Sequence, residues 1–321
     1  MSQKMRAHIL GMGSYLPEKI LTNADLEKIV DTTDEWITTR TGIKQRHIAA
    51  VDESTSDMGA KAARLAIADA GLSVDDIDLI VVATMTPDKL CPATAPLIQA
   101  KLGASHVGAF DVGAACSGYI YALSVAKSFV ESGAYCNVLV VATEKMSAMT
   151  DFTDRNTCIL FGDGAGAVVV SSEEKGFAID EITLGADGDH ADLMTIEAGG
   201  ASLSASHETV DARQHFFKMR GKQVYRLAVK VMGQLVQDCN KENLVAIIPH
   251  QANARIIEGI GKRLSQKVYN VVERYGNTSA SSIPIATLDY IKEHELEVGQ
   301  RLLLAAFGAG STWGGAIIRK I

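Results

Sequence analysis

The chain has 321 residues, a hydrophobic fraction of 47% and a formal net charge of −7 at pH 7. This length suits two closely packed halves, and the acidic balance argues against general nucleic-acid binding. No apolar run approaches the ~18 residues of a membrane span, and the N-terminal residues lack the apolar core of a signal peptide. Five cysteines without CxxC spacing are typical of reduced thiols, so we expect a cytoplasmic protein without disulfides or zinc.

Strand-like and helical segments alternate along the whole chain. Short β-branched runs indicate strands, and longer stretches with helical spacing indicate helices. This alternation predicts a mainly parallel sheet covered by helices. In chain order we expect a helix over 56–70, strands over 77–84 and 107–112, a helix over 119–132, a strand over 137–143, a helix over 221–239, a strand over 244–249, a helix over 253–264 and a strand over 301–307. The polar stretch 185–214 is predicted to be an excursion from this pattern.

A weak internal repeat divides the chain. The strand at 137–143 is followed by the glycine-rich segment 162–170, and the strand at 301–307 is followed by the similar segment 308–318. Both halves therefore end in a glycine-rich turn and a short apolar strand. This predicts two similar domains, 1–172 and 173–321.

Cys116 stands between the predicted strand at 107–112 and the predicted helix at 119–132. At such a helix N-terminus, unpaired N–H groups and the helix dipole stabilise a thiolate and lower the pKa of the thiol. The small residues on both sides of Cys116 leave room for a substrate. The segment therefore fits a nucleophile, although a buried core cysteine explains it equally well.

Two polar residues of the second half stand at comparable points. His250 follows the predicted strand at 244–249 and precedes a helix, at the sheet edge where open α/β sheets bind ligands. Asn277 lies in a turn before a helix, where alone it reads as a turn or cap residue. With Cys116, they fit either acyl transfer with His and Asn as hydrogen-bond donors, or a cysteine hydrolase in which His deprotonates Cys. The N–H groups of Cys116 and of the turn containing Ala309 would form an oxyanion hole.

Glycine-rich segments elsewhere give no support for a nucleotide cofactor. Gly11-Met12-Gly13 lacks the third glycine of a dinucleotide loop, so we expect a tight turn there. The segment 162–166 lacks the Lys-Ser/Thr of a phosphate-binding loop. No HExxH motif or Cys/His cluster indicates a metal.

Seven motifs occur in one order over nearly the full length: Thr33-Asp34-Glu35-Trp36-Ile37, Arg40-Thr41-Gly42-Ile43, Ala115-Cys116-Ser117-Gly118, Phe161-Gly162-Asp163-Gly164-Ala165-Gly166, His250-Gln251-Ala252-Asn253, Gly276-Asn277-Thr278-Ser279 and Phe307-Gly308-Ala309-Gly310-Ser311-Thr312-Trp313-Gly314. In these motifs the chain resembles the β-ketoacyl-acyl-carrier-protein synthase III family of thiolase-like condensing enzymes. The resemblance implies an α/β protein with a duplicated five-layer αβαβα fold, and a homodimer.

The resemblance also implies the initiating condensation of type II fatty-acid synthesis. An acyl-CoA primer would acylate Cys116. Malonyl-acyl carrier protein would then lose carbon dioxide and attack the acyl-cysteine, giving 3-oxoacyl-acyl carrier protein and free CoA. His250 and Asn277 would stabilise the enolate, and Phe307 would exclude water beside the cysteine. The family's reaction uses acyl-CoA as a substrate and needs no cofactor or metal.

Binding residues follow from the same resemblance. Coenzyme A would contact Trp36, Arg40, Arg155, Gly221, Tyr225 and Asn253. The acyl carrier protein would dock on Gln251, Ala252, Arg255, Lys262 and Arg263, although each cation also fits a solvated helix face. Cys91 stands where acetyl-primed bacterial members often carry a bulky aromatic residue, which closes the acyl pocket from the partner subunit. We therefore expect primers longer than acetyl to be accepted. The connectors before Leu244 and after Leu264, at the edge of the docking surface, are shorter than is usual in the family.

Three other functions remain open at this point. One is a related Cys-His-Asn enzyme that starts quinolone or polyketide synthesis from malonyl-CoA. The second is a cysteine hydrolase of acyl thioesters, and the third is a non-catalytic binding protein.

Overall fold

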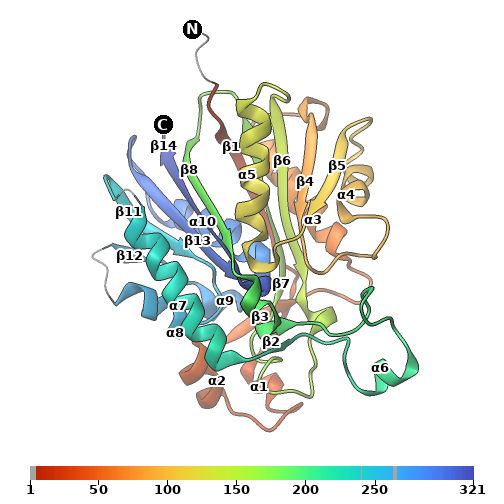
Figure 1. The fold of residues 1–321 in the computed structure, drawn as a ribbon. Coiled ribbons are helices and arrows are strands. Elements are labelled where there is room, and N and C mark those ends of the chain that lie inside the picture. Colours follow the sequence, from red (N-terminus) through yellow and green to blue (C-terminus); the bar gives the residue numbers. More distant parts are fainter. Residues whose placement is uncertain (1–4, 240, 263–265) are drawn as a thin grey trace.

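The computed structural model describes residues 5–239, 241–262 and 266–321, and Figure 1 shows their arrangement. The first half contains β1 (His8–Tyr15), β2 (Lys19–Thr22), α1 (Asn23–Leu26), α2 (Asp34–Thr41), β3 (Gln45–Ile48), α3 (Thr55–Asp69), β4 (Leu79–Ala83), α4 (Thr94–Leu102), β5 (Gly108–Val112), α5 (Gly118–Glu131), β6 (Asn137–Lys145) and β7 (Asp163–Ser171). The second half contains β8 (Phe177–Ala186), β9 (Met194–Thr195), α6 (His207–Asp211), β10 (Lys218–Met219), α7 (Gly221–Asp238), β11 (Leu244–Pro249), α8 (Ala254–Gly261), β12 (Lys267–Val268), α9 (Val272–Tyr275), α10 (Ser282–Glu293), β13 (Arg301–Gly308) and β14 (Thr312–Lys320).

The two halves repeat one strand order. Read inward from its outer edge, the first half runs β5, β4, β6, β7, β1, and the second runs β12, β11, β13, β14, β8. The halves join where β1 pairs antiparallel with β8, through His8 with Ala178 and Ile9 with Phe177. The repeat confirms the duplicated α/β fold. The division at residue 172 stays a prediction.

The sheet is mixed, so the prediction of a mainly parallel sheet is wrong. β4 pairs parallel with β5 and β6, and β11 pairs parallel with β12 and β13. β7 pairs antiparallel with β6 and β1, and β14 pairs antiparallel with β13 and β8. Only the short turn Ala309–Ser311 joins β13 to β14, which is too short for the crossover that a parallel pair requires. A connection as tight as this one forces an antiparallel pair, and the alternation of elements does not reveal it.

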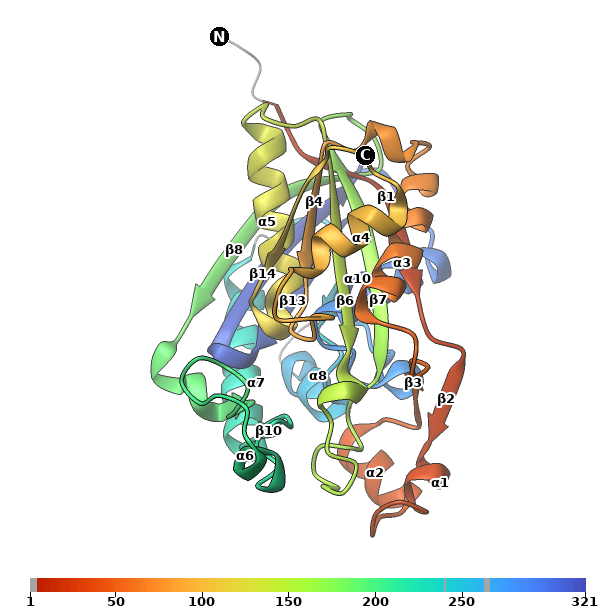
Figure 2. The same cartoon turned by 90° about the vertical axis from the view of Figure 1, so that its right-hand side faces the viewer.

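Helices form three layers around the two half-sheets, as Figures 1 and 2 show together. α5 and α10 lie between the half-sheets, where Ile120 and Ile283 share one hydrophobic core with Val140 of β6 and Leu304 of β13. A second core joins α3 and α4 to the outer face of the first half. A third core joins α7 and α8 to the second half. The order of layers is therefore αβαβα, as predicted.

The contact between α3 and β1 explains the glycines near the N-terminus. Ser54 and Asp57 form a capping box that begins α3, and the helix then turns an alanine-rich face to the sheet. A Cβ added to Gly11 would lie 2.3 Å from the backbone N of Ala70, so only glycine permits this approach. Gly11 and Gly13 lie inside β1, and the tight turn predicted there is wrong.

The polar stretch 185–214 holds only short elements, including α6, which protrudes from the layered body (Figures 1 and 2). None of the helices in the described ranges is long and apolar enough to cross a membrane.

Candidate active site

Cys116 lies in the 3₁₀ turn Ala115–Ser117, directly before α5. Ala115 adopts a left-handed φ of 46°, which is unusual for a residue with a side chain and persists only where the surroundings hold it. Thr312 holds this turn, because its hydroxyl oxygen lies 2.7 Å from Oγ of Ser117 and 3.1 Å from the carbonyl oxygen of Ala114. Cys116 itself is buried, with 7% of its surface exposed.

The turn after β13 packs directly against the cysteine backbone. A Cβ added to Gly308 would lie 2.8 Å from the backbone N of Cys116 and 2.9 Å from that of Ser117. Only glycine fits at this distance, which brings the turn containing Ala309 beside the N–H groups predicted to form an oxyanion hole. The structure thus brings together the two segments on which that prediction depends.

His250 follows β11 and is buried. Its Nδ1 lies 2.6 Å from Oγ of Ser282, and the same oxygen accepts a hydrogen bond from the backbone N–H of Gln251 at 3.3 Å. This arrangement favours donation from Ser282 to Nδ1, which leaves Nε2–H as the donor available to a ligand. Burial lowers the pKa of His250 to about 4, so the ring is neutral at physiological pH.

Asn277 lies between α9 and the 3₁₀ turn Ser279–Ser281, which leads into α10. Its backbone N–H donates to the carbonyl of Leu160 at 2.8 Å, and its carbonyl accepts from the N–H of Gly162 at 3.0 Å. Its side-chain oxygen accepts from the backbone N–H of Ser279 at 2.9 Å, which leaves the amide NH₂ for a ligand. Ser279 has a φ of 51°, close to that of Ala115, so the two halves present their site residues on similar turns.

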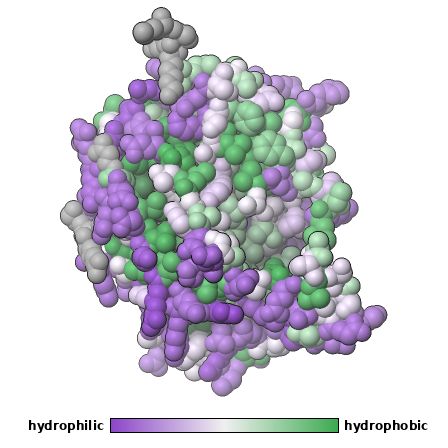
Figure 3. All heavy atoms as spheres, viewed as in Figure 1, coloured by the Kyte–Doolittle hydropathy of each residue, from purple (hydrophilic) through white to green (hydrophobic). Residues whose placement is uncertain are grey.

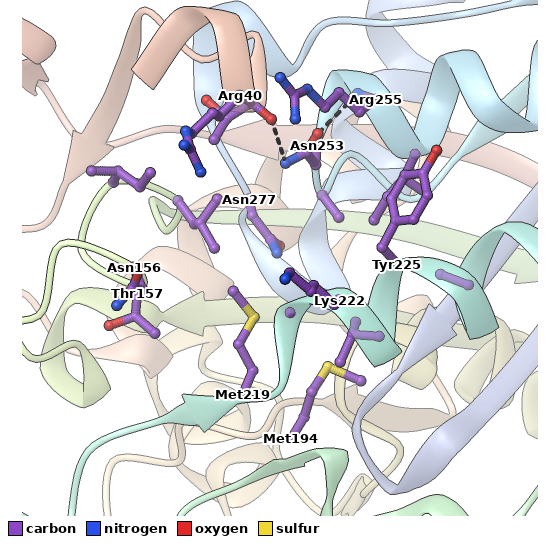
Figure 4. A pocket seen from close by; sticks show the side chains of 18 of the residues that line it. Arg40, Asn156, Thr157, Met194, Met219, Lys222, Tyr225, Asn253, Arg255 and Asn277 are labelled. Atoms are coloured by element: carbon purple, nitrogen blue, oxygen red, sulfur yellow. Dashed lines mark hydrogen bonds between the residues drawn. The ribbon is translucent and has the colours of Figure 1, made fainter. Parts of the chain in front are cut away.

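Cys116, His250, Asn277 and Phe307 line one cavity of about 980 Å³. Figure 4 looks into this cavity: Asn277 lies near its centre, Met194 and Met219 lie on one side, and Asn253 lies beside Arg40 on another. The residues that the sequence predicted as a catalytic group therefore meet in one place. Among the described residues, no group of three or more His, Cys, Asp or Glu side chains could hold a metal ion.

The mouth of the cavity is basic although the chain as a whole is acidic. Two acidic residues contribute to the lining, Asp154 and Glu258. Six basic residues do so, all of them exposed: Arg40, Lys218, Lys222, Arg226, Arg255 and Lys262. The space-filling view shows a mainly hydrophilic surface over the end of the molecule where α2 and the start of α7 lie (Figure 3).

The residues predicted to bind CoA gather at this mouth. The guanidinium of Arg40 lies 4.4 Å from the ring centre of Trp36, and that of Arg155 lies 5.0 Å from the same ring. Gly221, at the start of α7, and Tyr225 both line the cavity. Asn253 caps α8 through its side-chain oxygen and donates from Nδ2 to the carbonyl of Arg40 at 3.1 Å, as Figure 4 shows.

Of the residues predicted for carrier-protein docking, some are buried and others are exposed. Gln251 is buried, and its amide bonds the backbone of Pro249, Tyr269 and Val271. It cannot belong to a docking surface, so that prediction is wrong. Ala252 is half-buried in the cavity wall, whereas Arg255 and Lys262 are exposed at the mouth. Arg263 lies outside the described residues, and Cys91 is exposed in the loop after β4.

The thiol of Cys116 does not have the lowered pKa predicted from its place at a helix start. Its pKa is raised to about 12, mainly by burial and in smaller part by the charge of Glu144, against the lowering effect of hydrogen bonds from the Ser279 hydroxyl and the N–H of Cys116. A helix terminus contributes at most ~2 kcal/mol, which is less than the free energy of removing a thiolate from water. The resting cysteine is therefore a thiol at neutral pH, and its reaction requires a proton acceptor.

Three residues at this site were missed by the sequence reasoning: Ser279, Ser282 and Glu144. Both serines closely follow Asn277, and Glu144 comes at the end of an otherwise apolar strand. A carboxylate at the end of a buried strand was the one signal that could have drawn attention to Glu144.

Fold and cavity together define a thiolase-like condensing enzyme, which is an acyltransferase. The family models for 3-oxoacyl-[acyl-carrier-protein] synthase III match residues 110–188 and, for its C-terminal part, residues 237–320. The β-ketoacyl-[acyl-carrier-protein] synthase III of Caldanaerobacter subterraneus subsp. tengcongensis is 49% identical over 328 residues, covering 99% of each chain. The chain belongs to this family, whose members are condensing enzymes of type II fatty-acid synthesis.

Solved structures agree with this assignment. The 3-oxoacyl-[acyl-carrier-protein] synthase III of Aquifex aeolicus is 44% identical, with a TM-score of 0.88 over 98% of this chain and 99% of that chain. The priming β-ketosynthase of a polyketide biosynthetic pathway is 36% identical, with a TM-score of 0.90 over 100% of this chain and 98% of that chain. These matches confirm the thiolase-like fold.

Proposed function

We propose that Cys116 takes an acyl group from acyl-CoA and passes it to the carbanion formed from malonyl-acyl carrier protein. The single observation that carries this proposal is the shared cavity of Cys116, His250 and Asn277. In it a thiol faces two neutral hydrogen-bond donors, the Nε2–H of His250 and the NH₂ of Asn277. Neutral donors suit a reaction in which negative charge develops on a thioester oxygen.

In the first step, the sulfur of Cys116 attacks the thioester carbonyl of acyl-CoA, and the CoA sulfur leaves. The negative charge of the tetrahedral intermediate would be held by N–H groups of Cys116 and of the turn that follows Gly308. Phe307, which is 4% exposed, would cover the acyl-cysteine and exclude water. Exclusion of water separates transfer from hydrolysis, because an acyl-cysteine open to solvent would be released as free acid.

In the second step, the malonyl thioester loses carbon dioxide, and the electron pair of the breaking bond moves onto the thioester oxygen. His250 and Asn277 would donate hydrogen bonds to that enolate oxygen. The enolate carbon then attacks the carbonyl of the acyl-cysteine, and the sulfur of Cys116 leaves. Every bond that forms or breaks belongs to the two substrates or to the thioester of Cys116, so we infer that no cofactor is needed.

The basic mouth fits substrates that carry phosphate groups on a pantetheine arm. Trp36, with the guanidinium groups of Arg40 and Arg155 close to its ring, would stack with the adenine of CoA. Arg255 and Lys262 are the exposed cations that would steer an acidic carrier protein toward the cavity.

We further infer a cytoplasmic homodimer. β5 is the outermost strand of its half-sheet, and its Phe110 is 36% exposed. Leu90, in the loop after β4, is 89% exposed. Apolar side chains on an unpaired strand edge favour pairing with a second copy of the chain. Such pairing would carry Cys91 toward the partner's acyl pocket, where its small thiol leaves room for primers longer than acetyl.

A second candidate function is the priming of polyketide synthesis, which the likeness to a priming β-ketosynthase favours. Incubation of the protein with acyl-CoA and either malonyl-acyl carrier protein or malonyl-CoA distinguishes the two candidates. We expect 3-oxoacyl-acyl carrier protein from the first malonyl donor and little product from the second. Equal use of malonyl-CoA would favour the polyketide candidate, and release of free acid would favour a hydrolase.

A further inference from the structure

Glu144 is a fully buried carboxylate behind the candidate active site, at the end of β6. Its Oε2 accepts hydrogen bonds from the backbone N–H of Thr86 at 3.1 Å and from the hydroxyl of Thr86 at 2.6 Å. The hydroxyl of Thr84 and the N–H of Met85 also donate to this carboxylate, both at 3.1 Å. These four donors fix the carboxylate in one orientation.

The other carboxylate oxygen is turned toward the candidate nucleophile. Oγ of Ser279 lies 3.0 Å from Oε1 of Glu144 and 3.5 Å from Sγ of Cys116. One hydroxyl thus touches both the reacting sulfur and a carboxylate. Ser279 is held there by its left-handed backbone, with a φ of 51°, and by the bond from its N–H to Asn277.

We propose that Ser279 is a further catalytic residue for acylation of Cys116, and that Glu144 acts through it as the positioned acceptor of the thiol proton. This inference rests on the proposed role of Cys116 as the nucleophile. It answers the question that burial of the thiol raises, namely which group takes its proton.

During acylation the proton of the thiol moves along a relay, so that protons balance. As Sγ of Cys116 forms its bond to the acyl carbon, the thiol proton passes to Oγ of Ser279, and the Ser279 proton passes to Oε1 of Glu144. When the carbon–sulfur bond to CoA breaks, the relay runs in reverse and protonates the departing CoA sulfur. The exchange of one thioester for another therefore consumes no proton overall.

The groups around the relay are uncharged, neutral or turned away from it. The partners of Glu144 from the loop after β4 are uncharged, and the titratable group across Ser279 is Cys116 itself. His250, from β11, is neutral, and Nζ of Lys145 donates to the carbonyls of Ala50 and Glu53, away from Glu144. Burial raises the pKa of Glu144 to about 7, close to the range in which a general base works best at neutral pH.

The substitution Glu144→Gln tests the relay with little change in shape. The amide oxygen of a glutamine can keep the four donors of the 84–86 loop, while its NH₂ would donate to Ser279 and block proton acceptance. Ser279→Ala removes the middle of the relay. Ser147→Ala is the matched control, because the Ser147 hydroxyl donates to a different buried carboxylate, that of Asp163, at 2.6 Å.

The measurement is the single-turnover rate of Cys116 acylation by acyl-CoA, followed by intact mass across a pH series. We expect the wild-type rate to rise through about pH 7, and both relay variants to lose about 100-fold at neutral pH. In Glu144→Gln the rise should move to higher pH, while Ser147→Ala keeps the wild-type profile. Decarboxylation of malonyl-acyl carrier protein, which uses no thiolate, should persist in both relay variants.

A wild-type rate and pH profile in Glu144→Gln would overturn the relay. Parallel loss of acylation and decarboxylation would also overturn it, because that result indicates a merely structural role. Failure of the wild-type protein to become acylated at all would refute the proposed function instead, so the two failures are distinguishable.

Discussion

The side-chain oxygen of Asn277 accepts a hydrogen bond from the backbone N–H of Ser279 at 2.9 Å. This bond fixes the amide so that its NH₂ faces the ligand. The amide can therefore donate to a developing enolate, whereas the residue that orients the His250 ring is Ser282 and not Asn277, unlike the arrangement of a cysteine protease. The geometry thus supports condensation over hydrolysis.

The substitution Asn277→Ala should separate the two half-reactions. Loss of one donor to an enolate oxygen should slow decarboxylation of the malonyl thioester by about 100-fold. Acylation of Cys116 by acyl-CoA should fall far less, because the NH₂ of Asn277 takes no part in that step and Ser279 keeps the left-handed backbone that also holds it. Rapid-quench assays of each half-reaction check this, and a matching loss of acylation would contradict the assigned role.

The substitution Trp36→Ala should weaken recognition of the CoA nucleotide. We expect KM for acyl-CoA to rise by up to about tenfold with little change in kcat, because one stacking and cation–π partner is lost. Acyl-pantetheine, which lacks the nucleotide, is the control substrate and should be used equally by both proteins. An equal loss with both substrates would show that Trp36 supports the fold and does not bind the nucleotide.

Gly308→Ala should disrupt the cysteine turn. The added methyl would lie 2.8 Å from the backbone N of Cys116, so the turn must shift, at a cost of roughly 1–3 kcal/mol. We expect loss of acylation together with a lower melting temperature. Gly113→Ala is the matched control, since its Cβ would meet nothing within 4 Å. Full activity of Gly308→Ala would show that this contact does not position the nucleophile.

Glu144 should make stability depend on pH. Its pKa is about 7 in the folded protein against an ordinary value of 4.5, so the folded state binds this proton more tightly than the unfolded chain does. The resulting stability is present below about pH 4.5 and is lost as pH rises through about 7. Over this window wild type should lose up to about 3 kcal/mol relative to Glu144→Gln. Urea unfolding at several pH values checks this, and a pH-independent difference would contradict it.

The small side chain at Cys91 should permit longer primers. We expect acylation by octanoyl-CoA at a rate comparable with that by acetyl-CoA, and a shift toward acetyl-CoA in Cys91→Phe. Competition between the two acyl-CoAs, read by intact mass, measures the preference. Refusal of octanoyl-CoA alongside brisk acetyl transfer would contradict the prediction.

The residues at the centre of the site could be predicted from the sequence because their local signals are strong. Cys116 and His250 each follow a strand and precede a helix, which is where α/β sheets place ligand sites, and the packing of both half-sheets on α5 and α10 brings the two positions together. Asn277 could be predicted as a catalytic residue only together with Cys116 and His250, since alone it has the properties of a turn residue.

The remaining features depend on tertiary contacts that no local pattern records. The pKa of Cys116 is high because its thiol is buried, with the glycine-rich turn at Gly308 packed against the cysteine backbone. The burial of Gln251 follows from bonds to Tyr269 and Val271, and the orientation of Glu144 follows from a loop after β4. The spacing of residues in the sequence reveals none of these contacts. The predictions of a docking role for Gln251 and of a lowered thiol pKa were wrong for this reason.

The most direct test of the account is the intact mass of the protein after mixing with acyl-CoA, before and after addition of malonyl-acyl carrier protein. We predict that one acyl group appears on Cys116, is absent from Cys116→Ala, and is discharged as 3-oxoacyl-acyl carrier protein. An unmodified cysteine, or discharge as free acid, would contradict the central claim that this thiol holds an acyl chain for carbon–carbon bond formation.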